Sequence, residues 1–185
     1  MVEKGHLSFL IGLPRSGKST FAKTWEKQEV CGEAVSFMVP NKKVVLSGDN
    51  FRLAVGGTRY NEYVEPQVKY CLRSAARALL LSGYDVLIDD TNTTWDSIRE
   101  LLKLDPAATP IWHPNNSCFY KFAIPSPQFS AHVEECKERA KSLNQADLCV
   151  VIDRMASNLA EMWCVFRTRI EKEREKAKKA VWKIV

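Results

Sequence analysis

Hydrophobic runs alternate with amphipathic segments along most of the chain. The runs are short, and three of them end at polar residues, a pattern typical of buried strands. The segments between them carry apolar residues three and four positions apart, which indicates helices. The predicted strands cover residues 6–12, 42–49, 84–92 and 118–125. The predicted helices cover residues 17–28, 64–83, 93–104, 126–142 and about 151 onward.

This alternation predicts an α/β fold, with a parallel sheet of about four to five strands whose crossovers are right-handed and whose faces are flanked by helices. Residues 1–185 are expected to form one domain. In such sheets, ligands bind beyond the carboxyl ends of the strands. Three predicted strands run into polar residues there, at 12–20, 47–52 and 89–92. These segments are therefore expected to line one crevice, whereas residues 105–116 are expected to form a loop.

The first of these segments is a glycine-rich turn between a predicted strand and a predicted helix. Residues 12–19, GLPRSGKS, match the pattern G-x-x-x-x-G-K-[ST]. Gly12 and Gly17 let the backbone curl around phosphate oxygens, Lys18 reaches the β- and γ-phosphates, and Ser19 binds Mg²⁺. The turn therefore predicts a site for a nucleoside triphosphate. The residues expected to bind it are Gly12, Pro14, Arg15, Ser16, Gly17, Lys18, Ser19 and Thr20.

The second segment, SGDNFR, places an acid and a base one helical turn apart. Asp49 and Arg52 would face the same side of the crevice. Asp49 could accept the proton of an acceptor hydroxyl while Arg52 holds a neighbouring phosphate. The spacing fits equally well an aspartate that caps a helix and forms a surface ion pair.

The third segment, LIDDTN, ends a predicted strand with two aspartates. Alternation after Ile88 turns one of them away, and Asp90 is the expected partner of Ser19 and of Mg²⁺. Thr91 and Asn92 are expected to contact the substrate. The alternative is an ordinary turn ahead of a helix.

Composition limits the class of protein only broadly. A hydrophobic content of 45% and a charged content of 26% are those of a soluble globular protein, and the net charge of +5 suits an anionic ligand. We expect a cytoplasmic protein that does not interact with membranes, because neither a signal peptide nor a membrane-length apolar run is evident. The six scattered cysteines are expected to be free thiols.

The acceptor of the phosphoryl group is not fixed by the nucleotide-binding turn. The guanine-reading pattern N-K-x-D of GTPases is absent, because Asn41-Lys42 is followed by Lys43-Val44. A small chain with acidic strand ends favours a kinase that acts on a hydroxyl group. A non-catalytic regulator that binds ATP remains the alternative from another class.

The motifs GLPRSGKST, DNFR, DDTN, CKERAKS and VIDRM, in this order, resemble the kinase domain of phage-type polynucleotide 5′-hydroxyl kinases. The resemblance implies that Lys18 and Ser19 bind ATP and Mg²⁺ and that Asp49 is the general base for a 5′-hydroxyl. Arg52 would hold the phosphate on the 3′ side of the substrate, and Asp90 would help fix Arg52. The acceptor would be a DNA or RNA end or a 3′-nucleotide. A kinase of a nucleoside, nucleotide, sugar or antibiotic hydroxyl is the other enzyme that these motifs allow.

The same resemblance implies a helical lid over about residues 137–152, followed by a long C-terminal helix over about 152–183. The lid of these kinases carries arginines in the pattern R-N-x-x-R. Arg139 matches the first arginine, but Leu143 stands at the second, so Lys141 or Arg154 would have to replace it. The alternative for Arg139 and Lys141 is a solvated helix face. No D-x-D-x-T motif is present, so we expect no 3′-phosphatase activity.

A path for a single strand of nucleic acid requires basic side chains and aromatic platforms. Two sets of side chains around the second and third predicted helices could supply it, although they could also form an exposed helix face with buried tyrosines. The basic candidates are Arg52, Arg59, Lys69, Arg73 and Arg77, and the aromatic candidates are Phe51, Tyr60, Tyr63 and Tyr70. The charged run 167–183 instead suggests a solvated helix or the contact of a homo-oligomer.

Overall fold

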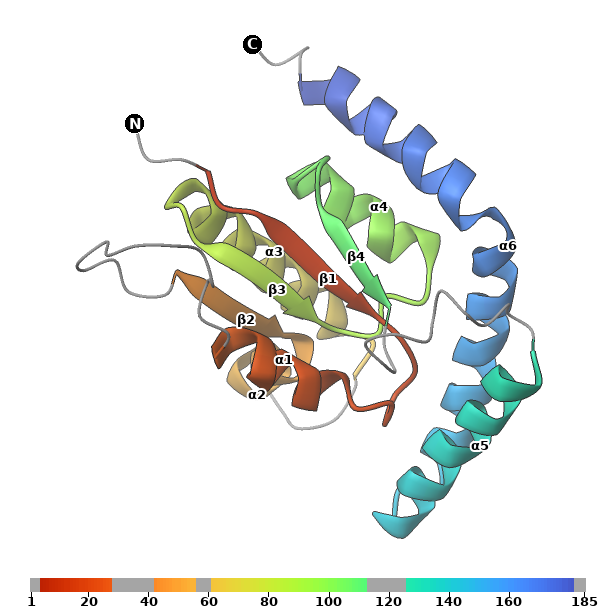
Figure 1. Cartoon of the computed structure of the whole chain (residues 1–185). Helices are drawn as coiled ribbons and strands as arrows, with labels where there is room; N and C mark the ends of the chain where they lie inside the picture. Colours follow the sequence, from red (N-terminus) through yellow and green to blue (C-terminus); the bar gives the residue numbers. More distant parts are fainter. Residues whose placement is uncertain (1–3, 28–41, 56–60, 113–125, 182–185) are drawn as a thin grey trace.

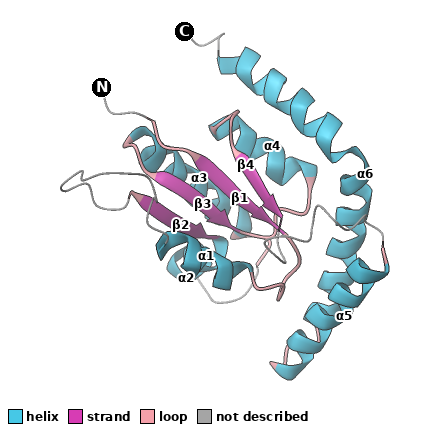
Figure 2. Cartoon of the chain, viewed as in Figure 1, coloured by secondary structure: helices cyan, strands magenta, loops and turns pink. Residues whose placement is uncertain are grey.

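The structure is a computed structural model that describes residues 4–27, 42–55, 61–112 and 126–181. Four strands and six helices alternate along these residues (Figures 1 and 2). The predicted strand 118–125, Arg59 and Tyr60 lie outside the described residues. The strands are β1 (Leu7–Ile11), β2 (Lys43–Ser47), β3 (Asp85–Asp89) and β4 (Thr109–Trp112). The helices are α1 (Lys18–Lys27), α2 (Gly48–Val55), α3 (Glu65–Leu81), α4 (Trp95–Leu104), α5 (Pro127–Ser142) and α6 (Leu148–Val181).

The four strands form one parallel sheet in the order β2-β3-β1-β4. The carboxyl ends of parallel strands lie at the same end of the sheet. The three predicted polar segments, which follow β2, β3 and β1, therefore lie side by side. Ser47 pairs with Asp89 in the register of β2 and β3, which puts the ends of these two strands level. The predicted α/β class is therefore confirmed.

Strand β4 corrects the expectation that residues 105–116 form a loop. Residues Thr109–Trp112 extend the sheet at its edge, where Pro110 pairs in register with Phe9 of β1. A proline within four residues argues against a central strand, because it donates no hydrogen bond. An edge strand needs a hydrogen-bonded neighbour on one side only, so the proline is compatible with this position.

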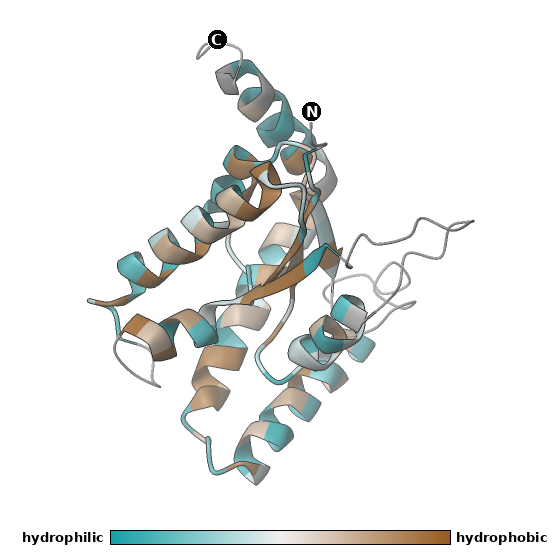
Figure 3. Ribbon diagram, turned by 90° about the vertical axis from the view of Figure 1, so that its left-hand side faces the viewer, coloured by the Kyte–Doolittle hydropathy of each residue, from teal (hydrophilic) through white to brown (hydrophobic). Residues whose placement is uncertain are grey.

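The two faces of the sheet bury different helices. Leu10 and Leu87 point to the face that α1 covers, where they meet Ala22. On the other face, Phe9 and Ile88 lie in the larger core, which includes residues of α3, α4, α5 and α6. The strands are accordingly mostly hydrophobic in Figure 3. Within the described ranges, no helix combines the length and the apolar character that crossing a bilayer would require.

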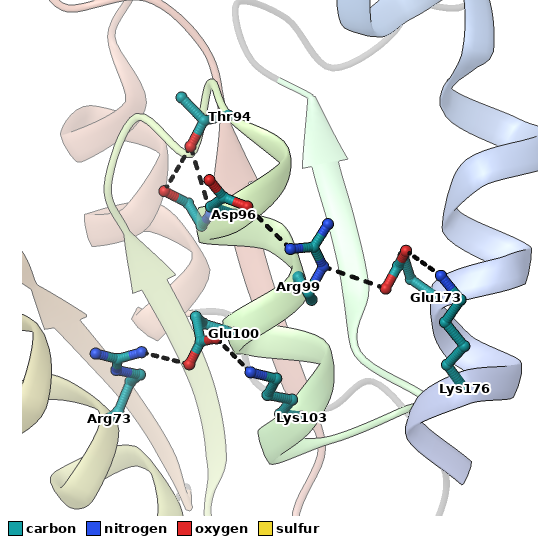
Figure 4. Close-up of polar contacts among 9 residues, drawn as sticks. Arg73, Thr94, Asp96, Arg99, Glu100, Lys103, Glu173 and Lys176 are labelled. Atoms are coloured by element: carbon teal, nitrogen blue, oxygen red, sulfur yellow. Dashed lines mark hydrogen bonds and ion pairs between the residues drawn. The ribbon is translucent and has the colours of Figure 1, made fainter. Parts of the chain in front are cut away.

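One face of the second half of α6 packs on the body of the chain, and the opposite face is exposed, so the expectation that the run 167–183 is a solvated helix holds for its outer face only. Ile170, Glu173 and Ala177 are buried. Glu173 forms an ion pair with Arg99 of α4 at 3.4 Å, as Figure 4 shows. Nη2 of Arg174 also donates to the carbonyl of Ala108 at 2.7 Å. Because this face is covered by the chain itself, it is not available for a contact between two copies.

Aromatic side chains fix the same helix to β4. The ring of Trp112 meets that of Trp163 edge-on, with centroids 5.0 Å apart, and that of Phe166 at 4.8 Å. Phe166 also stacks on Trp95 of α4. Such aromatic pairs stabilise a contact beyond the area that they bury.

Candidate active site

The turn between β1 and α1 has the geometry of a phosphate-binding loop. Gly17 has a φ of 97°, a left-handed conformation that glycine adopts at no steric cost, and α1 begins at the next residue. Lys18 is buried, and its ammonium donates to the carbonyl of Leu13 at 2.6 Å. The hydroxyl of Ser16 is buried and has no hydrogen-bond partner among the described residues. A buried hydroxyl at a helix N-terminus fits the oxygen of a bound phosphate.

The segment after β3 fastens this loop to the sheet. The N–H of Gly12 donates to the carbonyl of Thr91 at 3.0 Å. The side-chain amide of Asn92 donates to the carbonyl of Leu10 at 2.8 Å, and this residue is buried with a φ of 44°. Both contacts are structural, so a role of Thr91 and Asn92 in substrate binding stays a prediction.

The two aspartates that end β3 lie in different surroundings. Asp89 is buried and lies near Ser19 and Lys18. Burial raises the pKa of Asp89, and the hydroxyl of Ser19 and the charge of Lys18 oppose that shift. The carboxylate of Asp90 instead lies near Gly48, 3.2 Å from where a Cβ of that glycine would be. Asp89, which sequence reasoning set aside, is therefore a second candidate beside Asp90 for the carboxylate partner of Ser19, and the assignment of Asp90 stays a prediction.

Asp49 and Arg52 lie one turn apart on α2 and form an ion pair. The side chain of Asp49 is 86% exposed and is therefore accessible to a substrate, whereas that of Arg52 is 17% exposed. The position of a Gly48 Cβ would be 3.6 Å from Nη2 of Arg52, so Arg52 and Asp90 approach the same point. The charges of Asp90 and Asp49 both raise the pKa of Arg52, although a third carboxylate has the largest effect.

That third carboxylate is Glu65, the first residue of α3, which sequence reasoning missed. Its two oxygens accept from Nε of Arg52 at 2.9 Å and from Nη2 at 2.7 Å. Glu65 is buried, and the hydrogen bonds from Arg52 lower its pKa. A glutamate seven residues before the first leucine of a predicted helix carries no signal for such a pair. Only the adjacency of α2 and α3 in space reveals it.

Electrostatics tie the three segments to one site. Burial lowers the pKa of Lys18, and the nearby charges of Asp89, Asp90 and Asp49 raise it, in that order of strength. The sheet topology places Asp49 there as well, because it follows the end of β2 directly and β2 runs parallel to β3 and β1. The exposed carboxylate of Asp49 therefore lies at the same end of the sheet as the phosphate-binding loop.

The hairpin formed by α5 and α6 reaches the other side of the loop (Figure 1). Nη1 of Arg139 donates to the carbonyl of Arg15 at 3.2 Å, and its Nη2 pairs with Glu135. Lys141 pairs with Glu138 at 2.7 Å, and neither Lys141 nor Arg154 hydrogen-bonds to the loop in the part of the chain that the structure describes. The roles of Arg139 and Lys141 at a nucleotide stay predictions.

Within the described ranges, the side chains of the remaining predicted residues form no hydrogen bond at the centre of the site. Pro14 is half-buried, and Thr20 is exposed. Arg73 pairs with Glu100 of α4 at 2.7 Å and donates to the carbonyl of Lys69, so its guanidinium serves the junction of α3 and α4 (Figure 4). Its predicted contact with the substrate remains untested.

This fold and this loop together define a kinase-like P-loop domain. The family model AAA_33, described as an AAA domain, matches residues 7–111, which is more than half of the chain. The chain therefore belongs to this family of AAA domains. A search of curated protein sequences gave no match.

Solved structures share the fold at low sequence identity. A chain of the Pnkp1/Rnl/Hen1 RNA repair complex superposes with a TM-score of 0.57 and 23% identity over 86% of this chain. A second structure of that complex gives 0.53 and 23% over 75%. The structure of APE1195 gives 0.53 and 19%, covering 84% of this chain and 78% of that one. The chain spans 45% and 40% of the length of the two matched chains from the repair complex.

Proposed function

We propose that this protein is an ATP-dependent kinase that transfers the γ-phosphoryl group to the 5′-hydroxyl of a DNA or RNA end. The observation that carries the proposal is the exposed carboxylate of Asp49 in the first turn of α2, which follows β2 at the carboxyl ends of the strands, where the phosphate-binding loop also lies. A phosphoryl-transfer site needs a carboxylate that orients the acceptor hydroxyl and a cation that holds the terminal phosphates. A protein that only binds ATP has no need of the first group.

The described residues fit a nucleotide and its magnesium ion. The unpartnered hydroxyl of Ser16 and the buried ammonium of Lys18 suit phosphate oxygens. No group of three or more His, Cys, Asp or Glu side chains within the described ranges could hold a metal ion. Magnesium in such enzymes takes one or two protein ligands and completes its shell with phosphates and water. Ser19 and Asp89 are the proposed ligands, with Asp90 as the alternative to Asp89.

The residues of α2 suggest how the acceptor is handled. The hydroxyl oxygen would bond to the γ-phosphorus while the bond from that phosphorus to the β–γ bridging oxygen breaks, releasing ADP. Asp49 would take the hydroxyl proton. Glu65 accepts from Nε and Nη2 of Arg52, and Asp49 accepts from Nη1. The second N–H of Nη1 and that of Nη2 would hold a phosphate of the acceptor.

The outer face of α3 supports a polynucleotide as the acceptor. Tyr63 and Tyr70, seven residues apart, are 81% and 69% exposed, so these tyrosines are not buried core residues. Gln67 and Arg77 are exposed on the same line of α3 as Tyr70, and Tyr63 lies in the turn just before this helix. Exposed aromatic rings with a nearby cation form stacking platforms for the bases of a single strand. The RNA repair complexes among the structural relatives agree with such an acceptor.

The test is a transfer assay with γ-labelled ATP, Mg²⁺ and a panel of acceptors. The panel contains 5′-hydroxyl DNA and RNA oligonucleotides, a 3′-nucleotide, nucleosides and sugars. The matched control is the same oligonucleotide with a 5′-phosphate. We expect label on the 5′-hydroxyl ends and none on the control. Label on nucleosides or sugars alone would show that the acceptor is a small molecule and not a polynucleotide. Release of phosphate without any transfer would contradict the proposal of a kinase.

The face of α3 can be tested in the same assay. Replacing Tyr63 by Leu keeps an apolar side chain but removes the aromatic surface. Stacking contributes about 1–3 kcal/mol per base, so the KM for an oligonucleotide should rise about 5-fold or more. The KM for a 3′-nucleotide should change less, because it has no neighbouring bases to stack. Ser74→Ala, at another exposed position of α3, is the control and should leave both values unchanged.

A further inference from the structure

The phosphate-binding loop carries a second cation, Arg15, that the α5–α6 hairpin holds in place. Arg15 has a φ of 64° and an exposed side chain. Its Nη2 donates to Oε1 of Gln145, which lies in the turn between α5 and α6. Arg139 of α5 donates to the carbonyl of the same arginine. Two contacts from the hairpin therefore converge on one residue of the loop.

The backbone of the turn fixes where Gln145 lies. The N–H groups of Leu143 and Gln145 both donate to the carbonyl of Ala140, at 3.2 Å and 2.9 Å. Asn144 between them has a φ of 55°, which reverses the chain. The N–H of Leu148, the first residue of α6, donates to the carbonyl of Gln145 at 2.9 Å. The position of the amide thus follows from hydrogen bonds at both of its flanks.

The partner of Arg15 differs in charge from the partners of the other arginines around the site. Arg52 is paired with Glu65 and Asp49, and Arg139 with Glu135. Arg15 forms no ion pair with a carboxylate among the described residues; its side chain contacts a neutral amide. An amide oxygen orients a guanidinium without neutralising it and leaves the other N–H donors for another acceptor. The positive charge of Arg15 is therefore still available at the loop.

We propose that Arg15 is a second cation for the terminal phosphates of ATP, beside Lys18, and that Gln145 is the positioning residue that orients its guanidinium. The proposal rests on the nucleotide part of the function proposed above and is independent of the acceptor. In phosphoryl transfer, negative charge spreads over the oxygens of the γ-phosphoryl group, and fixed cations stabilise it. Leu143, where a lid arginine was expected, then needs no replacement from Lys141 or Arg154.

The experiment measures the affinity of a non-hydrolysable ATP analogue and of ADP, each with Mg²⁺, by titration calorimetry. Arg15→Ala should weaken the analogue at least about tenfold and ADP much less, because the charge acts on the terminal phosphate. Gln145→Ala should weaken the analogue about threefold. In the Arg15→Ala background it should have no further effect, since Gln145 acts through Arg15.

The decisive variant is Gln145→Glu, which keeps the shape of the side chain and adds a carboxylate. A purely structural contact would be kept or strengthened by this change, and affinity would stay at the wild-type value. The proposal instead requires an affinity loss close to that of Arg15→Ala, because the carboxylate neutralises the cation. Lys172→Ala, which removes an exposed cation of α6 outside the proposed site, is the control and should bind normally. Thermal melting of every variant separates loss of binding from loss of folding.

The outcomes distinguish this inference from the function on which it rests. If the wild-type protein bound no nucleotide, the proposed function itself would be contradicted. If it bound the analogue but Arg15→Ala or Gln145→Glu bound it equally well, only the role of Arg15 and Gln145 would be overturned. A loss in Lys141→Ala with none in Arg15→Ala would assign the second cation to the hairpin instead.

Discussion

Two buried aspartates lie at opposite ends of the strands of the sheet, and their surroundings differ. Asp105 lies at the edge where β1 and β4 begin and is 6% exposed. Its carboxylate accepts from the N–H of Leu7 at 3.3 Å and from that of Ala107 at 3.2 Å, and it pairs with Lys4 at 3.4 Å. Every one of these partners belongs to the fold itself. This edge is complete without a ligand.

Asp89 lies at the opposite edge, where β3 ends, and is 9% exposed. Burial raises its pKa, and nearby lie a buried ammonium and the unpartnered hydroxyl of Ser16. Polar groups that a fold buries without satisfying them are costly, and natural proteins keep them mainly where function needs them. The comparison teaches that burial of a charge alone does not mark a site. What distinguishes the two ends of the sheet is the buried hydroxyl of Ser16, which has no hydrogen-bond partner among the described residues.

The largest change in rate is expected from substitution of Asp49, the exposed acid at the carboxyl ends of the strands. Asp49→Asn should lower kcat at least about 10²-fold, because an amide cannot accept the hydroxyl proton. Affinity for an ATP analogue should change little, and stability should be unaffected, since the side chain of Asp49 is 86% exposed. Rates under saturating ATP and a calorimetric affinity measure both quantities. A variant that turns over normally would show that another group is the base.

Substitution of Asp105, where β1 and β4 begin, should change the stability of the protein and not its rate. Asp105→Ala leaves the N–H groups of Leu7 and Ala107 without their acceptor and should cost about 1–3 kcal/mol of unfolding free energy. Urea denaturation gives this value. The kcat of the folded variant should equal that of the wild type. If the rate fell while stability held, the contrast between the two edges would be lost.

The assignment of the magnesium ligand sharpens the comparison within the functional edge. Asp89→Asn should raise the Mg²⁺ concentration needed for half-maximal rate at least about tenfold, because the buried carboxylate near Ser19 is the proposed magnesium ligand. Asp90→Asn should shift this concentration less and should affect binding of the acceptor through Arg52. Rates measured across a magnesium titration decide between them. The reverse order would restore Asp90 as the ligand.

The smallest effect concerns Glu65, the satisfied acid at the functional edge. Arg52 lowers the pKa of Glu65, so the ionised carboxylate stabilises the fold above its unfolded-state pKa of about 4.3. This stabilisation is lost as the pH falls through the folded-state pKa. Glu65→Gln should therefore be less stable by about 1 kcal/mol at neutral pH, and the difference should shrink below about pH 4. A difference that does not vary with pH would contradict the ion pair as its cause.

Local patterns along the chain predicted the fold class, the phosphate-binding loop and the expectation that three strand ends meet. These features follow from hydrophobic periodicity and from the rule that parallel strands share one ligand-binding edge. Strand β4 was missed because a proline such as Pro110 argues against a strand. A strand can contain this proline only at the edge of the sheet, and no local sequence pattern shows which strand lies there. The burial of Glu173 in α6 was missed for a similar reason, since a run of alternating charges resembles a solvated helix.

The hydrogen-bonded pairs between residues far apart in the sequence were not predicted. Arg52 and Glu65 are 13 residues apart, and Arg15 and Gln145 are 130 apart. Neither pair lies on one helix, so no spacing rule connects its members. Asp89 was set aside because strand alternation turns one of the two aspartates away, but alternation alone does not tell which of them meets Ser19.

The central claim is that the Asp49 carboxylate and the terminal phosphate of ATP share one pocket. The most direct test is a crystal structure with a non-hydrolysable ATP analogue, Mg²⁺ and a short 5′-hydroxyl oligonucleotide. We predict the acceptor oxygen at about 2.6–3.2 Å from the Asp49 carboxylate and in line with the γ-phosphorus. An acceptor bound elsewhere, with Asp49 turned away from the triphosphate, would contradict the account.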